Sequence, residues 1–227
     1  MRNFTKLAVS LTTAGILVAG LAACSTPSTS TPSTSPSSSS STSADPTPLA
    51  SIPALDGVDT QVTLDTDFLA ALDSLGLAPA PLGTAAIDGA VISFPITGGN
   101  VDYYDPEESY RPYVQGSVEH DGSGLSLTAG ETVVELTDFR IDPGTSQLFG
   151  TVTANGTKVA DDVYIFNLDG STLNPLEEDA DGNAVLEGTT VLVSPDAAEL
   201  LNTTFGTDAV TDELVVGIAK ITAKAAA

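Results

Sequence analysis

The sequence predicts a mainly β domain, an antiparallel sandwich or barrel-like sheet with two short helices, which follows a long polar segment. Seven runs rich in β-branched residues are separated by Gly, Asn and Asp turn signals, as in antiparallel sheets. Two further stretches have helical rather than strand periodicity. The polar segment, residues 25–48, consists almost wholly of Ser, Thr and Pro and offers no large apolar side chain for a core.

The N-terminus has the pattern of a secretory signal peptide. Arg2 and Lys6 precede an apolar run, residues 7–23, which is interrupted by Ser, Thr and Gly and is too short for a membrane-spanning helix. Its Leu-Ala-Ala-Cys ending resembles the lipobox of bacterial lipoproteins. That resemblance implies cleavage before Cys24, lipidation of the Cys24 sulfur with acyl chains such as palmitate, and anchoring on the extracytoplasmic face of the cell membrane.

These features divide the chain into three parts. Residues 1–23 are expected to be a lipoprotein signal peptide, and residues 24–48 a lipidated cysteine with a disordered Ser/Thr/Pro tether. Residues 49–227 are expected to form a single β-rich extracellular domain. Cys24 is the only cysteine, so no internal disulfide can form.

The chain is strongly acidic, with 30 Asp and Glu against 7 Lys and Arg and a net charge of −23. Removal of residues 1–23 would leave five basic residues, so that the side chains of the mature chain would carry 5 − 30 = −25. A surface of this charge repels phosphate backbones and anionic lipid headgroups. The composition therefore argues against nucleic acid as a partner and leaves the lipid as the route to the membrane.

The strands are expected, in chain order, at residues 90–96, 114–120, 124–129, 132–141, 147–156, 162–168 and 185–193. The turn signals between them include Thr97–Asn100, Asp121–Gly124, Asp142–Thr145 and Asn155–Thr157. Short strands at this spacing are typical of antiparallel sandwiches and barrels.

Two stretches that resemble each other break the strand pattern, Val62–Ile87 and Val191–Ile221, which are offset by 191 − 62 = 129 residues. Each is expected to form a strand, a short helix and a second strand, so that the domain contains two pseudo-repeated units. Side-chain oxygens at the start of a helix accept from free N–H groups, and glycine ends a helix in the left-handed conformation. The expected N-caps are Asp65 and Ser194, and the expected terminating glycines are Gly76 and Gly206.

The sequence lacks the motifs of common catalytic and metal sites. One histidine and one cysteine exclude the usual Cys/His zinc site, and no nucleophile elbow, Walker loop or dinucleotide-binding glycine motif is present. A Ser-His-Asp triad would need His120 with Ser123 and Asp121, neighbours on one expected turn that rarely hold a relay geometry. The acidic segment Glu177–Asn183 lacks the Gly and Glu that a calcium loop requires and is expected to be a solvated hairpin tip. We therefore expect no catalytic residue and no metal site.

Six residues are candidates for ligand binding: Tyr103, Tyr104, Tyr110, Arg111, Tyr113 and His120. The first five lie in residues 101–113, where Tyr and Arg side chains on a loop would make good contacts, although the same rings can pack on the core at a strand edge. His120 ends an alternating strand and shares a face with Val114 and Val118. We expect it to be structural, at the edge where that face meets solvent, with one ring nitrogen hydrated.

Two short motifs resemble the HtaA-type haem-transport domain of corynebacteria, a β-rich surface domain. They are SYRPYV, residues 109–114, and GSVEHDGSGL, residues 116–125. The resemblance implies haem as a ligand, with Tyr113 bound to the iron and His120 as its supporting partner. More broadly, residues 62–221 look similar to an uncharacterised group of secreted actinobacterial proteins, which implies a β-rich lipoprotein without an assigned activity.

The sequence therefore predicts a lipid-anchored cell-surface lipoprotein whose domain binds or displays something without catalysis. An unknown extracellular ligand or protein is the expected partner, and no cofactor is expected. A haem-binding surface protein of HtaA type is the alternative. An enzyme that acts on envelope glycans through two carboxylates comes third.

Overall fold

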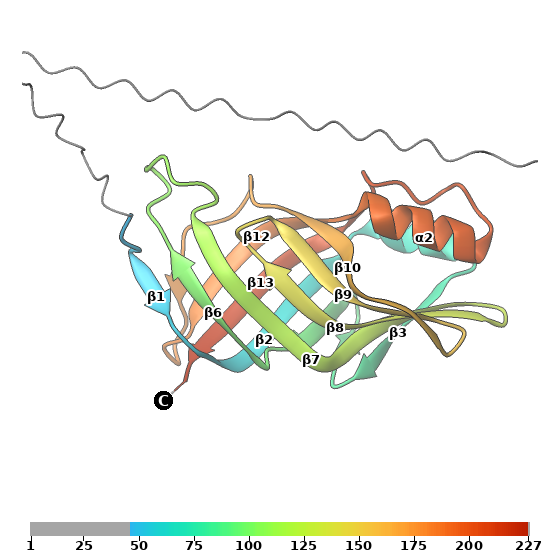
Figure 1. Cartoon of the computed structure of the whole chain (residues 1–227), viewed down its shortest axis with the longest axis horizontal. Helices are drawn as coiled ribbons and strands as arrows, with labels where there is room; N and C mark the ends of the chain where they lie inside the picture. The colour runs from blue at the N-terminus through green and yellow to red at the C-terminus, as the bar shows by residue number, and fades with distance from the viewer. Residues whose placement is uncertain (1–45, 227) are drawn as a thin grey trace, which may run out of the picture. The chain divides into compact units, whose positions relative to one another are not determined.

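The computed structural model describes residues 46–226, so the predictions for the signal peptide, for Cys24 and for most of the tether lie outside the described residues. The described part is mainly β with two short helices, as the sequence predicts (Figure 1). Within these residues, no helix combines the length and the hydropathy that are needed to cross a membrane.

Residues 46–226 form thirteen strands and two helices. The helices are α1 (Thr66–Ser74) and α2 (Pro195–Phe205). The strands are β1 (Ala50–Ile52), β2 (Leu55–Leu64), β3 (Ala78–Gly83), β4 (Ala86–Asp88), β5 (Val91–Pro95), β6 (Gly98–Tyr103), β7 (Val114–Ala129), β8 (Thr132–Asp142), β9 (Gln147–Ala154), β10 (Thr157–Asp169), β11 (Glu177–Glu178), β12 (Ala184–Val193) and β13 (Val215–Ala225).

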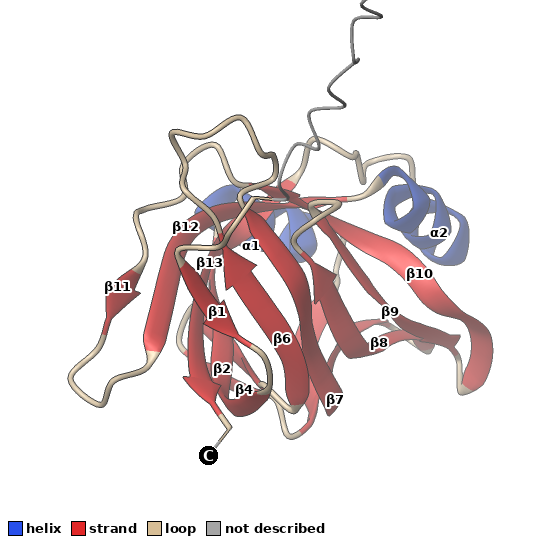
Figure 2. Cartoon of the chain, turned by 60° about the vertical axis from the view of Figure 1, so that its left-hand side comes forward, coloured by secondary structure: helices blue, strands red, loops and turns tan. Residues whose placement is uncertain are grey.

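The strands form one antiparallel sheet that curls on itself (Figure 2). Its main path runs β1-β6-β7-β8-β9-β10-β12-β13-β2-β5-β4, with β11 paired to β12 and β3 paired to β7. Only Ile96 and Thr97 separate β5 from β6, which lie near opposite ends of that path. The Thr97 N–H donates to the Glu119 carbonyl oxygen at 2.8 Å, which fixes this corner to β7. This short connection brings the two ends of the sheet together and gives it the barrel-like shape that the sequence predicts.

The expected turn at Asp121–Gly124 is a bulge inside one long strand, so that prediction is wrong. The register of β7 against β8 shifts between His120 and Gly124. Three residues of β7 here face the single Asp138 of β8, whose carboxylate accepts from the Gly122 N–H at 2.9 Å. A β-bulge bends a strand without ending it, and β7 therefore continues through this segment.

Two other strand boundaries differ from the expected ones. The Thr97–Asn100 segment is mostly strand rather than turn, because β6 begins at Gly98. β10 begins at Thr157, earlier than expected, because the two-residue turn Asn155–Gly156 joins it directly to β9. Both turn residues have positive φ, 50° and 73°, which suits a tight hairpin.

Both helices begin at the N-caps that the sequence predicts. The Asp65 carboxylate accepts from the N–H groups of residues 67 and 68, at 2.8 and 3.3 Å. The Ser194 hydroxyl accepts from the Ala197 N–H at 3.0 Å and donates to the Tyr164 carbonyl oxygen at 2.6 Å. The second contact ties the start of α2 to β10, so Ser194 stabilises both the helix and its position on the sheet.

The helices also end at the glycines that the sequence predicts, and each buries one apolar face. Gly206 ends α2 at φ 67°, and Gly76 follows α1 at φ 65°, conformations that glycine adopts without a steric cost. α1 buries Phe68 and Leu72, and α2 buries Leu201 together with two alanines. These side chains face the curled sheet, so the helices cover one end of it (Figure 1).

The pseudo-repeat holds for each strand and helix but not for the strand that follows. After α2, β13 returns beside β12 and pairs with it, so that Val191 lies opposite Gly217. After α1, β3 pairs with β7 instead of β2, so the two strand-helix-strand units that the sequence predicts differ in the pairing of their second strands. Residues 75–77 alone connect α1 to β3, whereas the longer connection 206–214 lets the chain return to its own strand.

β3 contains two prolines, Pro79 and Pro81, and pairs along its length with β7. Proline has no N–H, so in an antiparallel ladder it fits only where that group would point away from the partner strand. The outward edge of β3 therefore lacks a donor at both prolines.

Two clusters of buried apolar side chains fill the curled sheet. The larger lies beneath the helices and includes Phe68, Leu72 and Leu201. The smaller includes Leu55 and Val118 and lies toward β1, which Figure 1 shows at the end opposite the helices. The segment 104–113, between β6 and β7, rises at this second end.

Candidate functional site

A cavity of about 420 Å³, which we call the loop-end cavity, lies beside the segment 104–113. Its walls come from the start of β7, from the turns that follow β8 and β10, and from β12 and β13. The lining residues are Arg111, Pro112, Tyr113, Val114, Ile141, Pro143, Ser146, Leu168, Gly170, Ser171, Leu173, Leu186, Thr189, Ala219 and Ile221. Apolar side chains dominate, and one cation and several hydroxyls interrupt them, as in many small-molecule sites.

The four tyrosines of this region have different environments. Tyr103 is buried in β6, and its ring packs edge-to-face on Tyr113 with the centroids 5.7 Å apart. Tyr104 and Tyr110 pack together at 4.5 Å, and Tyr110 is 37% exposed. The Tyr104 N–H donates to the Tyr113 carbonyl oxygen at 2.7 Å and closes the loop. Of the four, Tyr113 alone lines the loop-end cavity, and Tyr103 packs in the buried core.

Arg111 is exposed and lies at the wall of the same cavity. Its guanidinium donates to the carbonyl oxygens of Tyr110, at 3.2 Å, and of Pro106. The same group lies over the Tyr113 ring, 5.4 Å from the centroid, which is a cation–π geometry. The guanidinium has five N–H donors, so these two hydrogen bonds leave donors for another partner.

Tyr113 is partly buried, and this changes its acidity. Burial raises the pKa of the Tyr113 phenol above its ordinary value, and the neighbouring Tyr103 adds to the rise. The Arg111 charge opposes it but does not reverse it. The phenol is therefore neutral at physiological pH and can donate or accept a hydrogen bond.

His120 is buried, with 1% of its surface exposed, so the prediction of a hydrated nitrogen at a strand edge is wrong. Its Nδ1 donates to the Phe139 carbonyl oxygen at 3.2 Å, and its Nε2 lies 2.8 Å from the Thr60 hydroxyl. Because a carbonyl oxygen only accepts, the neutral ring carries its proton on Nδ1 and accepts from Thr60. The structural role that the sequence predicts fits this geometry, and the error arose because β7 continues beyond His120 rather than ending there.

Burial also dominates the acidity of His120. Desolvation lowers the pKa of the ring to about 4, although the hydrogen bond to Phe139 and the charges of Asp121 and Asp59 act in the opposite direction. The Phe94 ring packs edge-on against the imidazole at 6.5 Å. The ring is therefore neutral at physiological pH and packs as part of the interior.

The structure does not bring His120 and Tyr113 into one cavity. His120 lines a smaller cavity of about 50 Å³. Ile141, Leu168 and Ala219 belong to the walls of both cavities and lie between them. Because both ring nitrogens of His120 already have partners, its geometry does not suit the supporting role that the resemblance to HtaA-type domains implies.

Sequence reasoning missed most of the polar cavity wall. The hydroxyls come from Ser146, Ser171 and Thr189, which lie on separate turns or strands. Thr189 follows Gly188, where the register of β12 against β13 shifts and a positive φ of 112° is adopted. No local motif marks these residues, because the curl of the sheet alone brings them together.

The acidic segment Glu177–Asn183 is the tip of a hairpin, as the sequence predicts, because Glu177–Glu178 form β11 and pair with the start of β12. The Asp179 carboxylate accepts from the N–H groups of Asp181 and Asn183 and from the Asn183 side chain, each at 2.9 Å. The side-chain hydrogen bond from Asn183 is the main cause of a lowered Asp179 pKa. In the part of the chain that the structure describes, no group of three or more His, Cys, Asp or Glu side chains is arranged to hold a metal ion.

Comparison with known proteins gives a likeness in structure but none in sequence. No protein family and no curated protein matches the sequence. The C-terminal domain of HtaA from Corynebacterium glutamicum matches at a TM-score of 0.51, with 13% identity over 75% of this chain and 97% of that one. Heme binding protein HtaB from the same organism matches at 0.49, with 7% identity over 77% of this chain and 96% of that one. The described domain therefore has the fold of the HtaA C-terminal domain.

Proposed function

We propose that this domain binds a small, largely apolar ligand without catalysing a reaction, and that haem is the first ligand to test. The loop-end cavity carries the proposal. Its volume of about 420 Å³ lies within the range of roughly 300 to 1,000 Å³ that is typical of ligand pockets. Its walls combine a large apolar surface with a few polar groups that can orient a ligand.

Haem enters the proposal through the fold shared with the HtaA C-terminal domain and through the two motifs that resemble HtaA-type domains. The cavity fits haem in its chemistry. Tyr113 is the one lining side chain that can ligate iron, and Arg111 can pair with a propionate. Val114, Leu186 and Ile221 offer apolar contact for the macrocycle. Bound haem would supply an iron centre with a strong Soret absorption, and the residues named here would hold and orient it.

Hemin titration of the purified full chain tests the proposal. We expect one hemin to bind with a sharp Soret band, and Tyr113→Phe to weaken binding about tenfold or more while it keeps the ring packing on Tyr103. Thr189→Trp should also weaken binding, because the larger side chain occupies part of the cavity that the ligand needs. Tyr164→Phe is the matched control, since Tyr164 lies on β10 outside the cavity wall and should leave the titration unchanged.

The same titration has a predicted pH dependence. Burial raises the pKa of the Tyr113 phenol, and iron binds the phenolate, so a proton must leave when iron binds. Hemin affinity should therefore increase with pH between about 6 and 9 in the wild type and should change less in Tyr113→Phe. Equal pH profiles for the two proteins, or hemin binding that Tyr113→Phe leaves intact, would contradict iron ligation by Tyr113.

We also propose that a lipid on Cys24 holds the domain on the extracytoplasmic face of the cell membrane. The basic start, the apolar run and the Leu-Ala-Ala-Cys ending of residues 2–24 support this part of the proposal. In Cys24→Ala we expect the protein to appear in the medium or to keep residues 1–23. Fractionation of cells with and without detergent measures the location and gel mobility measures the processing, and a variant that loses residues 1–23 yet stays in the membrane fraction would rule the lipid anchor out.

A further inference from the structure

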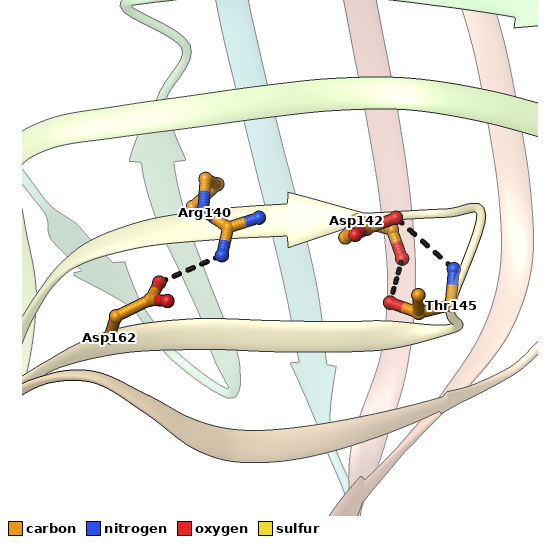
Figure 3. A network of polar contacts seen from close by, with 4 residues as sticks. All are labelled: Arg140, Asp142, Thr145 and Asp162. Carbon is orange, nitrogen blue, oxygen red and sulfur yellow. Dashed lines mark hydrogen bonds and ion pairs between the residues drawn. The ribbon is translucent and has the colours of Figure 1, made fainter. Parts of the chain in front are cut away.

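Arg111 differs from the other basic residues in the described part of the chain. Each of the other four lies within ion-pair distance of a carboxylate, and Figure 3 shows one of these pairs. The pairs are Arg140–Asp162 at 2.7 Å, Lys158–Asp161 at 2.5 Å, Lys220–Glu187 at 3.9 Å and Lys224–Asp56 at 3.9 Å. Arg111 has no carboxylate at such a distance within residues 46–226, and its contacts are with two carbonyl oxygens and a ring.

This lack of an ion pair is unexpected in so acidic a chain. The net charge is −23, and the segment that carries Arg111 also carries Asp105, Glu107 and Glu108. The Asp105 carboxylate instead accepts from the Glu107 N–H at 2.9 Å and so serves the loop backbone. A guanidinium that keeps free donors matches a carboxylate in shape and charge, and such charge-assisted hydrogen bonds are among the stronger ones in proteins.

Two smaller apolar cavities adjoin the loop-end cavity and share wall residues with it. Val114, Leu186 and Ile221 belong both to its wall and to the wall of a cavity of about 90 Å³ that reaches toward β1. On another side it adjoins the cavity of about 50 Å³ beside His120. The loop-end cavity itself measures about 420 Å³ and has mostly apolar walls, so a ligand whose polar end meets Arg111 has apolar space there for a hydrocarbon body.

From these observations we infer that Arg111 binds an acidic group of the ligand, so that the cavity accepts an apolar molecule carrying a carboxylate. This inference rests on the proposed function and adds the class of ligand that Arg111 selects. Two kinds of molecule carry a carboxylate on an apolar body: a long-chain fatty acid, and a porphyrin with its propionates. Recognition by Arg111 needs no iron in either case, and the local cation offsets the long-range repulsion that the acidic chain exerts on an anion.

Paired acid and ester probes isolate the charge. The purified full chain is titrated with the fluorescent fatty acid cis-parinaric acid and with its methyl ester, and then with iron-free protoporphyrin IX and its dimethyl ester. Members of each pair share one hydrocarbon body and differ in charge. We expect the wild type to bind an acid about tenfold or more tightly than its ester, as a charge-assisted hydrogen bond predicts.

Variants assign that preference to one residue. Arg111→Gln should lose the preference, with the acid weakened about tenfold or more and the ester unchanged. Arg111→Lys keeps the charge and should retain part of the preference. Arg140→Gln is the matched control, because Arg140 also lies over a ring, Phe149 at 4.6 Å, but is paired with Asp162 and lies outside the cavity.

The outcomes separate this inference from the function on which it rests. Acid and ester that bind equally, or a preference that survives in Arg111→Gln, would overturn the inference while cavity binding stands. If no probe binds saturably, or if Thr189→Trp leaves binding intact, the proposed function falls as well. The acid that binds more tightly in the wild type identifies the source, since a flexible chain and a flat macrocycle fit the loop-end cavity differently.

Discussion

The two ends of the curled sheet are closed in different ways. At the helix end, α1 and α2 cover a cavity of about 30 Å³ whose walls are wholly apolar. At the loop end, the cavity is about 420 Å³ and its wall includes Tyr113, Arg111 and three hydroxyl side chains. The first space is little more than the room for one water molecule, whereas the second has the size and polarity of a ligand site.

The covering elements explain this difference. A helix presents one apolar face, so Phe68 and Leu72 of α1 and Leu201 of α2 fill the space between helix and sheet. The loop 104–113 packs the rings of Tyr104 and Tyr110 against each other, and of its residues only Arg111, Pro112 and Tyr113 line the cavity. The same sheet thus has a closed, structural end and an open end that is available for binding.

The largest expected effect is a loss of stability when a buried side chain is truncated at the helix end, compared with truncation of a cavity-wall side chain at the loop end. Phe68→Ala should lower the free energy of unfolding by about 3–5 kcal/mol, because it removes a buried ring from the closed end. Leu173→Ala, in the wall of the loop-end cavity, should cost about 1 kcal/mol or less, since this side chain already borders open space. Urea denaturation measures both, and equal losses would show that the two ends do not differ in packing.

A second prediction concerns His120, which lies in the interior between the two ends. Desolvation lowers its folded-state pKa to about 4, whereas an unfolded histidine titrates near 6.5. Between these values the unfolded chain binds a proton that the folded chain does not, so stability is full above about pH 6.5 and is lost as the pH falls toward 4. The loss should approach roughly 3 kcal/mol.

The measurement uses the fact that the chain has one histidine. Its NMR titration should show a single midpoint far below 6.5, and urea denaturation from pH 7 to pH 4 gives the stability. His120→Gln lacks the titrating group but keeps the carboxylates, so the difference between the two stability curves isolates the ring. Parallel curves for the wild type and the variant would contradict the buried, neutral imidazole.

The smallest effect is expected outside both ends. Asp162→Asn breaks the ion pair with Arg140 on the sheet surface (Figure 3), where Asp162 is 67% exposed. We expect a change of less than about 1 kcal/mol in the free energy of unfolding, because exposed pairs are weak and asparagine tolerates the positive φ of 53° at this position. A larger loss would mean that this surface contributes to the fold as the helix end does.

Local patterns predicted the parts of the fold that depend on near neighbours in sequence. Asp65 and Ser194 cap the helices because a cap needs only the following three residues. The Asn155–Gly156 hairpin likewise follows from its own two residues. The β-rich class and the short helices were therefore predictable from composition and spacing.

Features that depend on distant residues were not predictable in this way. The Asp121–Gly124 segment has the composition of a turn, but Asp138 on β8 accepts from its backbone and holds it as a bulge. His120 is buried because β7 continues past it and Thr60 packs against its ring. At the candidate site, the Tyr and Arg residues were named from sequence, whereas Thr189 reaches the cavity only through the curl of the sheet.

The prolines of β3 have a consequence for the behaviour of many copies of this protein in close proximity. An exposed strand edge normally offers alternating donors and acceptors to which a strand from another molecule can add. Pro79 and Pro81 remove two donors from the outward edge of β3, so at both positions an added strand would find a carbonyl oxygen without its matching N–H group. β3 can therefore border the sheet without becoming a template for chain-to-chain β-aggregation, even at high local concentration.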